Sequence, residues 1–169
     1  MFERLDTPKQ LFDFQLGSAL TMEHDSLMML KELGVTANAD DVKELFTHHQ
    51  TETQGQIENL ERIFRSFDMQ PDRSPSSTTK GMMKEGTSLI AKARGDLADN
   101  AAITAALGTE HYEISVYESL IIAAEAMGEP GTVDLLEENL AEEKHTSEEL
   151  VKLARTVTAR ARVHGSHAS

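Results

Sequence analysis

The stretch ITAALGTEHYEISVYESLIIAAEAM, which runs from Ile103 to Met127, has the pattern of a long helix with a polar centre. Glu110, Glu113 and Tyr117 lie about one turn apart in the middle of an apolar stripe. The residues of that stripe recur at the three- and four-residue spacing of one helix face: Ile103, Ala106, Leu107, Ile121 and Ala124. The pattern therefore predicts a core-facing helix whose buried face carries two carboxylates.

Three other long segments repeat this arrangement of an apolar face that turns polar near its middle. A step of about 100° per residue places Glu23 on the inward face of the first segment and Glu143 on that of the last. On the second segment His49 and Gln56 fall on the apolar face, and Glu52 lies on its flank. Each long helix is thus expected to bring at least one carboxylate to a common core.

Caps and helix breakers divide the chain into four long helices and a short one. Thr7 and Pro8 are typical of a helix start, and Gly34 is typical of a helix end. The stretch 69–79, with two prolines, is predicted to be the longest loop. The expected helices run from Pro8 to Leu33, from Asn38 or Asp40 to Phe67, from about Lys80 to Leu97, from Asp99 or Asn100 to Met127, and from Pro130 to about Arg162.

Two helix pairs joined by a long connection describe an all-α four-helix bundle with one long crossover that contains the short fifth helix. The 169 residues fit one domain, which we expect to span residues 1–163, with a flexible C-terminal tail at 164–169.

Composition excludes several classes of function. The chain has no cysteine, which removes thiolate nucleophiles and iron–sulfur clusters. A formal net charge of −13 disfavours nucleic acid as a partner. The chain also shows neither a secretory signal at its start nor an apolar run of the roughly 20 residues that a bilayer requires. We therefore expect a cytoplasmic protein with no membrane partner.

The inward carboxylates should reach a similar depth in the bundle, and neither Lys nor Arg falls on any of the four stripes. Burying unpaired charge costs several kcal/mol per group, so two divalent metal ions are the expected cofactors. Oxygen-rich ligation favours iron, manganese or magnesium. The predicted ligands are Glu23, Glu52, Glu110, Glu113 and Glu143.

Four further residues are candidates for additional ligands or for side chains that support the ligands: His49, Gln56, His111 and Tyr117. Tyr117 is most simply a core aromatic residue whose hydroxyl finds a carboxylate partner. Glu142 and His145 match the Glu-x-x-His spacing of di-iron helices, but both project off the apolar stripe. We therefore interpret that match as coincidental.

Three segments resemble the YciF-like family of bacterial ferritin-like stress proteins: HQTETQGQIE from His49, EHYEISVY from Glu110 and LAEEK from Leu140. The resemblance covers most of the chain. It implies a ferritin-like bundle, a homodimer and an association with stress, and it places the five predicted carboxylate ligands at the family's inward positions. Gln56 departs from the usual ferritin-like Glu-x-x-His, and a neutral amide is a weaker ligand than imidazole.

Two hypotheses about function follow. In the first, a dinuclear iron or manganese site reacts with oxygen or peroxide, in an oxidase, peroxidase or catalase-like manner. Such a site would take electrons from an external donor, because the chain has no cysteine-rich module. In the second, the protein is a non-catalytic dimeric helical stress protein with a structural or vestigial metal site. Whether the protein is an enzyme stays open at this point.

Overall fold

The computed structural model describes residues 4–165, and that range contains five helices and no strand. None of these helices combines the length and the apolar character needed to cross a membrane. The helices are α1 (Pro8–Thr36), α2 (Asp40–Ser66), α3 (Ser77–Lys92), α4 (Asp96–Met127) and α5 (Pro130–Gly165).

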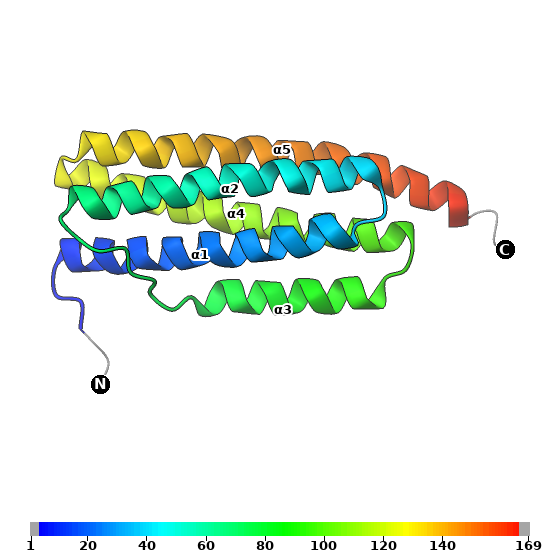
Figure 1. Cartoon of the computed structure of the whole chain (residues 1–169), viewed down its shortest axis with the longest axis horizontal. Helices are drawn as coiled ribbons and strands as arrows, with labels where there is room; N and C mark the ends of the chain where they lie inside the picture. The colour runs from blue at the N-terminus through cyan, green and yellow to red at the C-terminus, as the bar shows by residue number, and fades with distance from the viewer. Residues whose placement is uncertain (1–3, 166–169) are drawn as a thin grey trace.

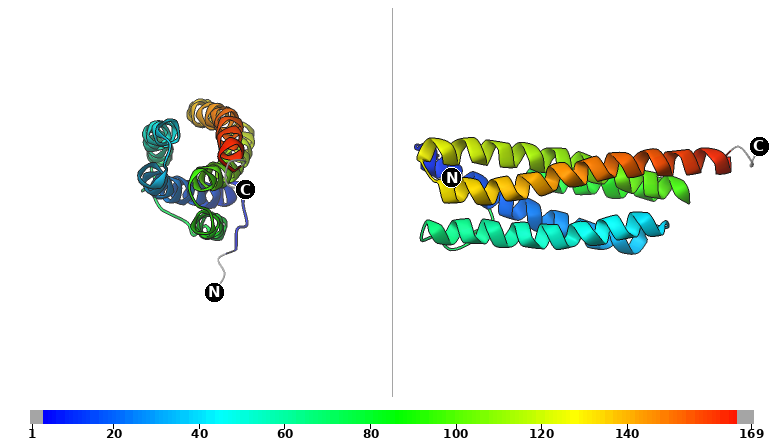
Figure 2. Two further views of the ribbon diagram at one scale, coloured as in Figure 1. Left: turned by 90° about the vertical axis from the view of Figure 1, so that its right-hand side faces the viewer. Right: turned by 90° about the horizontal axis from the view of Figure 1, so that it is seen from above.

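The four long helices form the bundle, and α3 lies outside it (Figures 1 and 2). The pairs α1/α2 and α4/α5 are antiparallel hairpins, and contacts of α1 with α4 and of α2 with α5 close the ring. The crossover through α3 returns the chain along the bundle, so α4 runs parallel to α2 (Figure 1). The predicted all-α bundle with a short helix in its crossover is confirmed.

Two apolar layers fill the bundle on either side of its middle. One is built around Phe12, Leu60 and Leu120, and the other around Leu30, Phe46 and Ile103, among other residues. The polar centres of the four stripes lie between these layers. Among the described residues, neither layer contains a lysine or an arginine that could neutralise charge buried between them.

The first helix continues beyond its predicted end. The sequence assigns Gly34 as the cap after Leu33, but α1 runs to Thr36, whose hydroxyl donates to the carbonyl of Glu32 at 2.9 Å. A Cβ at Gly34 would lie 3.1 Å from Nε2 of Gln50 on α2. This glycine therefore permits the close approach of two helices rather than ending one.

The starts of α2 and α4 also differ from the prediction, because of one side chain. Asp99 lies inside α4, which begins at Asp96 after Gly95 (φ +56°), and it does not cap its own helix. Its buried carboxylate accepts the backbone N–H groups of Asn38 at 2.8 Å and Ala39 at 2.9 Å. Ala39, which offers no side-chain cap, is thus the N-cap of α2, and Asp99 satisfies this helix end from another helix.

The remaining differences concern α3 and α5. Ser76 caps α3, which therefore runs from Ser77 to Lys92, earlier than the predicted Lys80–Leu97. At the other end of the chain α5 continues to Gly165, past the predicted end at Arg162. Of the predicted tail, residues 164–165 are thus helical, and residues 166–169 lie outside the described range.

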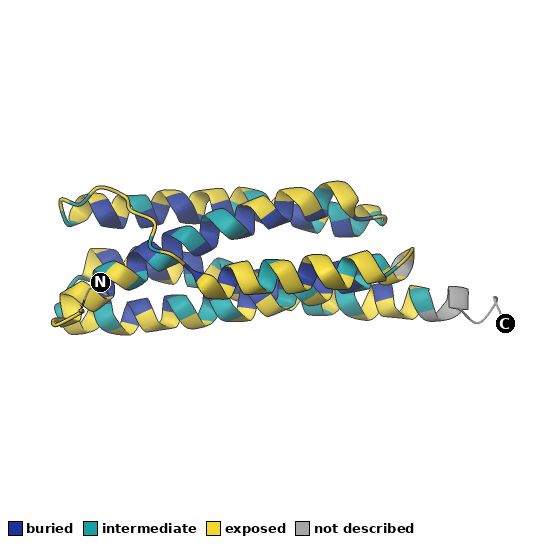
Figure 3. Cartoon of the chain, turned by 90° about the horizontal axis from the view of Figure 1, so that it is seen from below, coloured by how far each residue is buried: buried dark blue, intermediate teal, exposed yellow. Residues whose placement is uncertain are grey.

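The crossover is fastened to α1 where a glycine allows close approach. A Cβ at Gly17 would lie 2.6 Å from the hydroxyl of Ser74 and 3.1 Å from the carbonyl oxygen of Asp72. The N–H of Ser74 donates to the carbonyl of Gly17, and Thr21 donates to the carbonyl of Ser74 at 2.7 Å. Among its own residues α3 buries Thr79 and Gly86 alone, so its outward face is largely exposed (Figure 3).

We expect Asp99→Ala to destabilise the fold by about 2–3 kcal/mol, because it removes charge-assisted hydrogen bonds and leaves the start of α2 without a cap. Urea unfolding followed by circular dichroism measures the change. The control is Asp72→Ala in the exposed crossover segment, which should stay within about 0.5 kcal/mol of wild type. Equal stability of the two variants would contradict the role given to Asp99.

Candidate metal centre

The middle of the bundle holds ionisable side chains from all four long helices. Glu23 comes from α1, His49 from α2, Glu110 and Glu113 from α4, and Glu143 from α5, and each is at most 2% exposed. The helical periodicity of the four stripes brings them to one depth between the two apolar layers. Four carboxylates and one imidazole therefore share a dry interior.

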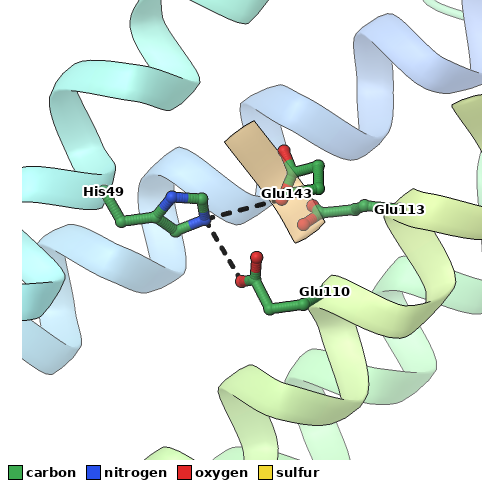
Figure 4. A group of neighbouring side chains, drawn as sticks. All are labelled: His49, Glu110, Glu113 and Glu143. Atoms are coloured by element: carbon green, nitrogen blue, oxygen red, sulfur yellow. Dashed lines mark ion pairs between the residues drawn. The ribbon is translucent and has the colours of Figure 1, made fainter. Parts of the chain in front are cut away.

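Four of these residues converge on a single point (Figure 4). One ligand atom from each of His49, Glu110, Glu113 and Glu143 lies within 4.8 Å of the others. Nε2 of His49 is 3.1 Å from Oε1 of Glu110 and 3.9 Å from Oε2 of Glu143. Two ligands of one ion, each at about 2.0–2.2 Å, are at most roughly 4.4 Å apart, so small side-chain rotations would close this group around a cation.

The donor atoms of the cluster lack hydrogen-bond partners. Both oxygens of Glu113, both of Glu143, and one each of Glu23 and Glu110 are buried without one. The part of the chain that the structure describes buries neither lysine nor arginine to compensate them. Orphaned carboxylate oxygens beside an imidazole are the donor set of iron and manganese sites, so the residues present fit the metals expected from the sequence.

Burial changes the protonation of these carboxylates. It raises the pKa of Glu23 to about 8, against the opposing effect of a hydrogen bond from Tyr117. Burial raises the pKa of Glu113 well above its ordinary value, and the charges of Glu23 and Glu110 add to the shift. The pKa of Glu143 rises for the same reasons, namely burial and then the charges of Glu113 and Glu110. Without a cation, the cluster therefore holds protons near neutral pH.

For His49 the neighbouring carboxylates affect the pKa more strongly than burial does. Burial alone would lower its pKa, but the charge of Glu110 and the hydrogen bonds with Glu110 and Glu52 outweigh burial and raise the pKa well above its ordinary value. In the metal-free protein this imidazole is the one buried counter-charge among the described residues of the cluster.

Glu52 lies at the edge of the cluster, with a side chain that is 15% exposed. Its carboxylate is 3.2 Å from Nδ1 of His49, accepts from the hydroxyl of Thr146 at 3.2 Å, and is 3.3 Å from Nε2 of His48. Burial opposes its ionisation, but the hydrogen bond and the charge of His49 outweigh that effect and lower its pKa. The structure thus places Glu52 behind His49, outside the group of four.

The opposite side of the cluster is fixed by a hydrogen-bonded chain. Asn59 donates to Asn139 at 2.9 Å, Asn139 donates to the hydroxyl of Tyr117 at 3.0 Å, and Tyr117 donates to Oε1 of Glu23 at 2.5 Å. Because Asn139 occupies Tyr117 as an acceptor, the phenol proton is directed to Glu23. The other oxygen of Glu23 is left without a partner.

The remaining sequence candidates divide into two groups. Gln56 is fully buried beside the cluster, and its side-chain amide lacks a hydrogen-bond partner. His111 is exposed on α4, so the expectation that it supports the site is corrected: one residue past Glu110, it has already turned 100° toward solvent. His145 is likewise exposed, and Glu142 is half-buried.

Three residues at or next to the site were not predicted from the sequence: Asn59, Asn139 and Thr146. Their positions on the inward faces carried a signal, because Asn139 lies four residues before Glu143 and Thr146 three residues after it. Thr146 thus stands where di-iron bundles carry the histidine of Glu-x-x-His. The imidazole of this cluster comes instead from His49 on α2.

The fold places the chain in a known structural class of helical bundles. A structure of ferritin-like, diiron-carboxylate proteins from Bacillus anthracis superposes with a TM-score of 0.69 at 19% identity, covering 89% of this chain and 99% of that one. At this identity the likeness concerns the fold alone, and the chain has a ferritin-like fold.

Within that class, residues 7–162 match the family described as a domain of unknown function, DUF892, and the chain belongs to this family. Protein YciF of Escherichia coli is 30% identical over 152 residues, which cover 89% of this chain and 92% of YciF. The predicted likeness to the YciF-like family is confirmed.

Two solved structures extend the comparison. The crystal structure of the E. coli stress protein YciF has a TM-score of 0.87 at 29% identity and covers 92% of this chain and 99% of that one. YcfI of Rhodopseudomonas palustris, described as a structural protein, has a TM-score of 0.86 at 30% identity and covers 89% of this chain and 97% of its own.

The raised pKa values predict how stability depends on pH. A carboxyl with a raised pKa binds its proton more tightly in the folded state, so its stabilising effect is present at low pH and is lost as pH rises through the folded pKa. For Glu23 that window runs from 4.5 to about 8. Glu113, Glu143 and His49 shift in the same direction. Metal-free protein should therefore lose stability between about pH 5 and pH 8.

Chelator-treated protein unfolded by urea across this range tests the prediction. Glu23→Gln should flatten the pH profile because it removes one titrating group, and Glu58→Gln on the exposed face of α2 should reproduce the wild-type profile. Stability that stays constant or rises across the range in metal-free wild type would show that the prediction is wrong.

Proposed function

We propose that this protein binds two divalent metal ions, iron or manganese, in the core of its bundle and uses them to react with oxygen or peroxide during stress. The observation that carries the proposal is the group of buried, unpartnered carboxylate oxygens that no buried lysine or arginine neutralises within the described residues. The stress setting is extended from the E. coli relative, which is described as a stress protein.

The number of ions follows from charge. Glu23, Glu110, Glu113 and Glu143 are the four fully buried glutamates of the described chain. Two divalent ions would balance the four negative charges of these carboxylates when His49 is neutral. A single divalent ion would balance two of these charges, and protons would have to neutralise the other two carboxylates. Metal binding would displace the protons that the raised pKa values retain.

The proposed ligands are divided between two metal positions. The convergence of His49, Glu110, Glu113 and Glu143 supports one position. Glu23 would complete the other, with Glu113 and Glu143 shared between the two, and Glu52 would reach the first position from the edge beside His49. Gln56, which is buried beside them, would be at most a weak neutral ligand.

A pair of redox-active ions would supply two electrons for the reduction of oxygen or peroxide, and in a catalase-like cycle would take two electrons back from the oxidation of a second peroxide. The two apolar layers exclude water from the centre. Tyr117 holds Glu23 through one oxygen and leaves the other free for a ligand bond. Electrons for repeated turnover would come from an external donor, since the chain has no cysteine.

A second candidate function is supported by specific observations. Thr146 and Gln56 occupy inward positions where an imidazole would bind metal more tightly, and the R. palustris relative is described as a structural protein. In this alternative a structural or vestigial metal site stabilises a non-catalytic bundle. It predicts no peroxide consumption by metal-loaded protein.

Metal content tests the proposal. Protein loaded with Fe²⁺ or Mn²⁺ without oxygen and then desalted should retain about two ions per chain in elemental mass spectrometry. Glu113→Gln should lose most of this metal, and Glu118→Gln, an exposed position on the same helix, should retain it. Wild-type protein that retains none would contradict the proposal.

Activity separates the two candidates. Metal-loaded wild type should consume peroxide or oxidise Fe²⁺, Glu113→Gln should lose this activity, and Glu118→Gln should keep it. Stoichiometric metal without turnover would favour the structural alternative.

The family resemblance also leads us to propose a homodimer. Size-exclusion chromatography with light scattering should give about twice the 18.7 kDa mass of the chain. A monomer mass at all concentrations would contradict this proposal.

A further inference from the structure

The candidate metal centre is closed to solvent, so an ion must pass between helices to reach it. Glu23, Glu113 and Glu143 are fully buried, and Glu110 is 1% exposed. The apolar layers block both directions along the bundle axis. One hollow, of about 170 Å³ between α1, α3 and α4, is lined chiefly by apolar residues such as Met29, Leu33 and Ile90, which offer a cation little.

The seam between α2 and α5 has a different character. Its cross-helix contacts near the centre are polar: Thr146 donates to Glu52, Asn59 donates to Asn139, and Asn139 also donates to the carbonyl of Gln56. Glu142 on this seam is half-buried, and burial and the charge of Glu52 raise its pKa. This seam is therefore where polar groups extend from the centre toward solvent.

A groove of about 490 Å³ opens along the same seam. Its lining comes from α2 and α5 and includes three carboxylates against one lysine: Asp41, Glu44, Leu45, His48, Glu149, Lys152, Leu153 and Thr156. Glu44 is an exposed residue of this lining, and His48 lies at the end of the α2 lining nearest Glu52. Lys152 pairs with Glu149 and Arg160 pairs with Asp41, each at 2.7 Å. The negative charge that favours cations over anions in the groove therefore comes chiefly from Glu44.

A chain of close contacts leads from this groove into the centre. Nε2 of His48 is 3.3 Å from Glu52, the other oxygen of Glu52 is 3.2 Å from Nδ1 of His49, and Nε2 of His49 is 3.1 Å from Glu110. Side-chain exposure falls along the same path, from 66% at His48 to 15% at Glu52, 2% at His49 and 1% at Glu110. At each step the next oxygen or nitrogen ligand lies within 3.3 Å of the one before it.

We propose that divalent cations reach the buried centre through this α2/α5 groove and are transferred from His48 and Glu52 to His49 and Glu110. The route rests on the proposed metal-binding function and adds to it a path and a role for Glu52. His48 and Glu44 act before the ion is bound, so they should affect the rate of uptake and not the amount of metal held at equilibrium.

The test measures the kinetics of uptake separately from the final content. Metal-free protein is mixed with Co²⁺ without oxygen in a stopped-flow instrument, the ligand-field absorption of bound cobalt is followed, and the final content is measured by elemental analysis. His48→Lys places a cation beside Glu52, and Glu44→Lys places one in the exposed lining of the groove. The matched control, His111→Lys, makes the same change at an exposed position on α4.

The expected result is uptake slowed by about tenfold or more in His48→Lys and Glu44→Lys, with the same final cobalt content as wild type. His111→Lys should match wild type in both respects. Added salt should slow uptake by wild type more than uptake by Glu44→Lys, because screening acts on the charge that this substitution removes.

Three results would overturn the route. Uptake at the wild-type rate in both groove variants, with full cobalt content, would refute the route and leave the proposed function intact. A reduced final content in His48→Lys would make His48 a ligand and not part of a path. Wild-type protein that takes up no cobalt would refute the proposed function, and the route with it.

Discussion

Uncompensated negative charge in the middle of the bundle is the constraint on which the rest of this structure depends. Glu23, Glu110, Glu113 and Glu143 share a buried layer, and His49 is the one imidazole among them. Replacing the whole layer by apolar residues would be the simplest way to stabilise a helical bundle. A fold that retains all of them instead requires protons or cations to complete it, and this requirement links its stability to protonation and, under the proposed function, to metal binding.

The surroundings of the layer limit how it can respond. Apolar clusters above and below prevent hydration, and the hydrogen-bonded chain that ends at Tyr117 fixes the orientation of Glu23. On the α2/α5 side the packing is polar and Glu52 is half-buried. One side of the centre is therefore held by hydrogen bonds, and the other side carries the polar seam that we propose as the route of the ions.

Local patterns in the sequence predicted most of the fold because helix periodicity and caps are properties of neighbouring residues. The four long helices, the crossover and the inward position of Glu23 on its helix could be derived in this way. Asp99 could not, since it caps a helix that lies about 60 residues away along the chain. His111 could not be placed for a different reason. It lies on the flank of a stripe, where tertiary packing decides whether a side chain faces the core or the solvent, and the structure shows it exposed.

The path of the crossover has an electrostatic consequence for the centre. Because α3 carries the chain back along the bundle, each long helix lies antiparallel to both of its neighbours (Figure 1), and their macrodipoles oppose one another. The influence of a helix end also fades within about a turn, and Glu23, His49, Glu113 and Glu143 all lie more than two turns from the ends of their helices. The peptide dipoles thus give the carboxylates little help, and protons or bound cations must supply the balancing charge.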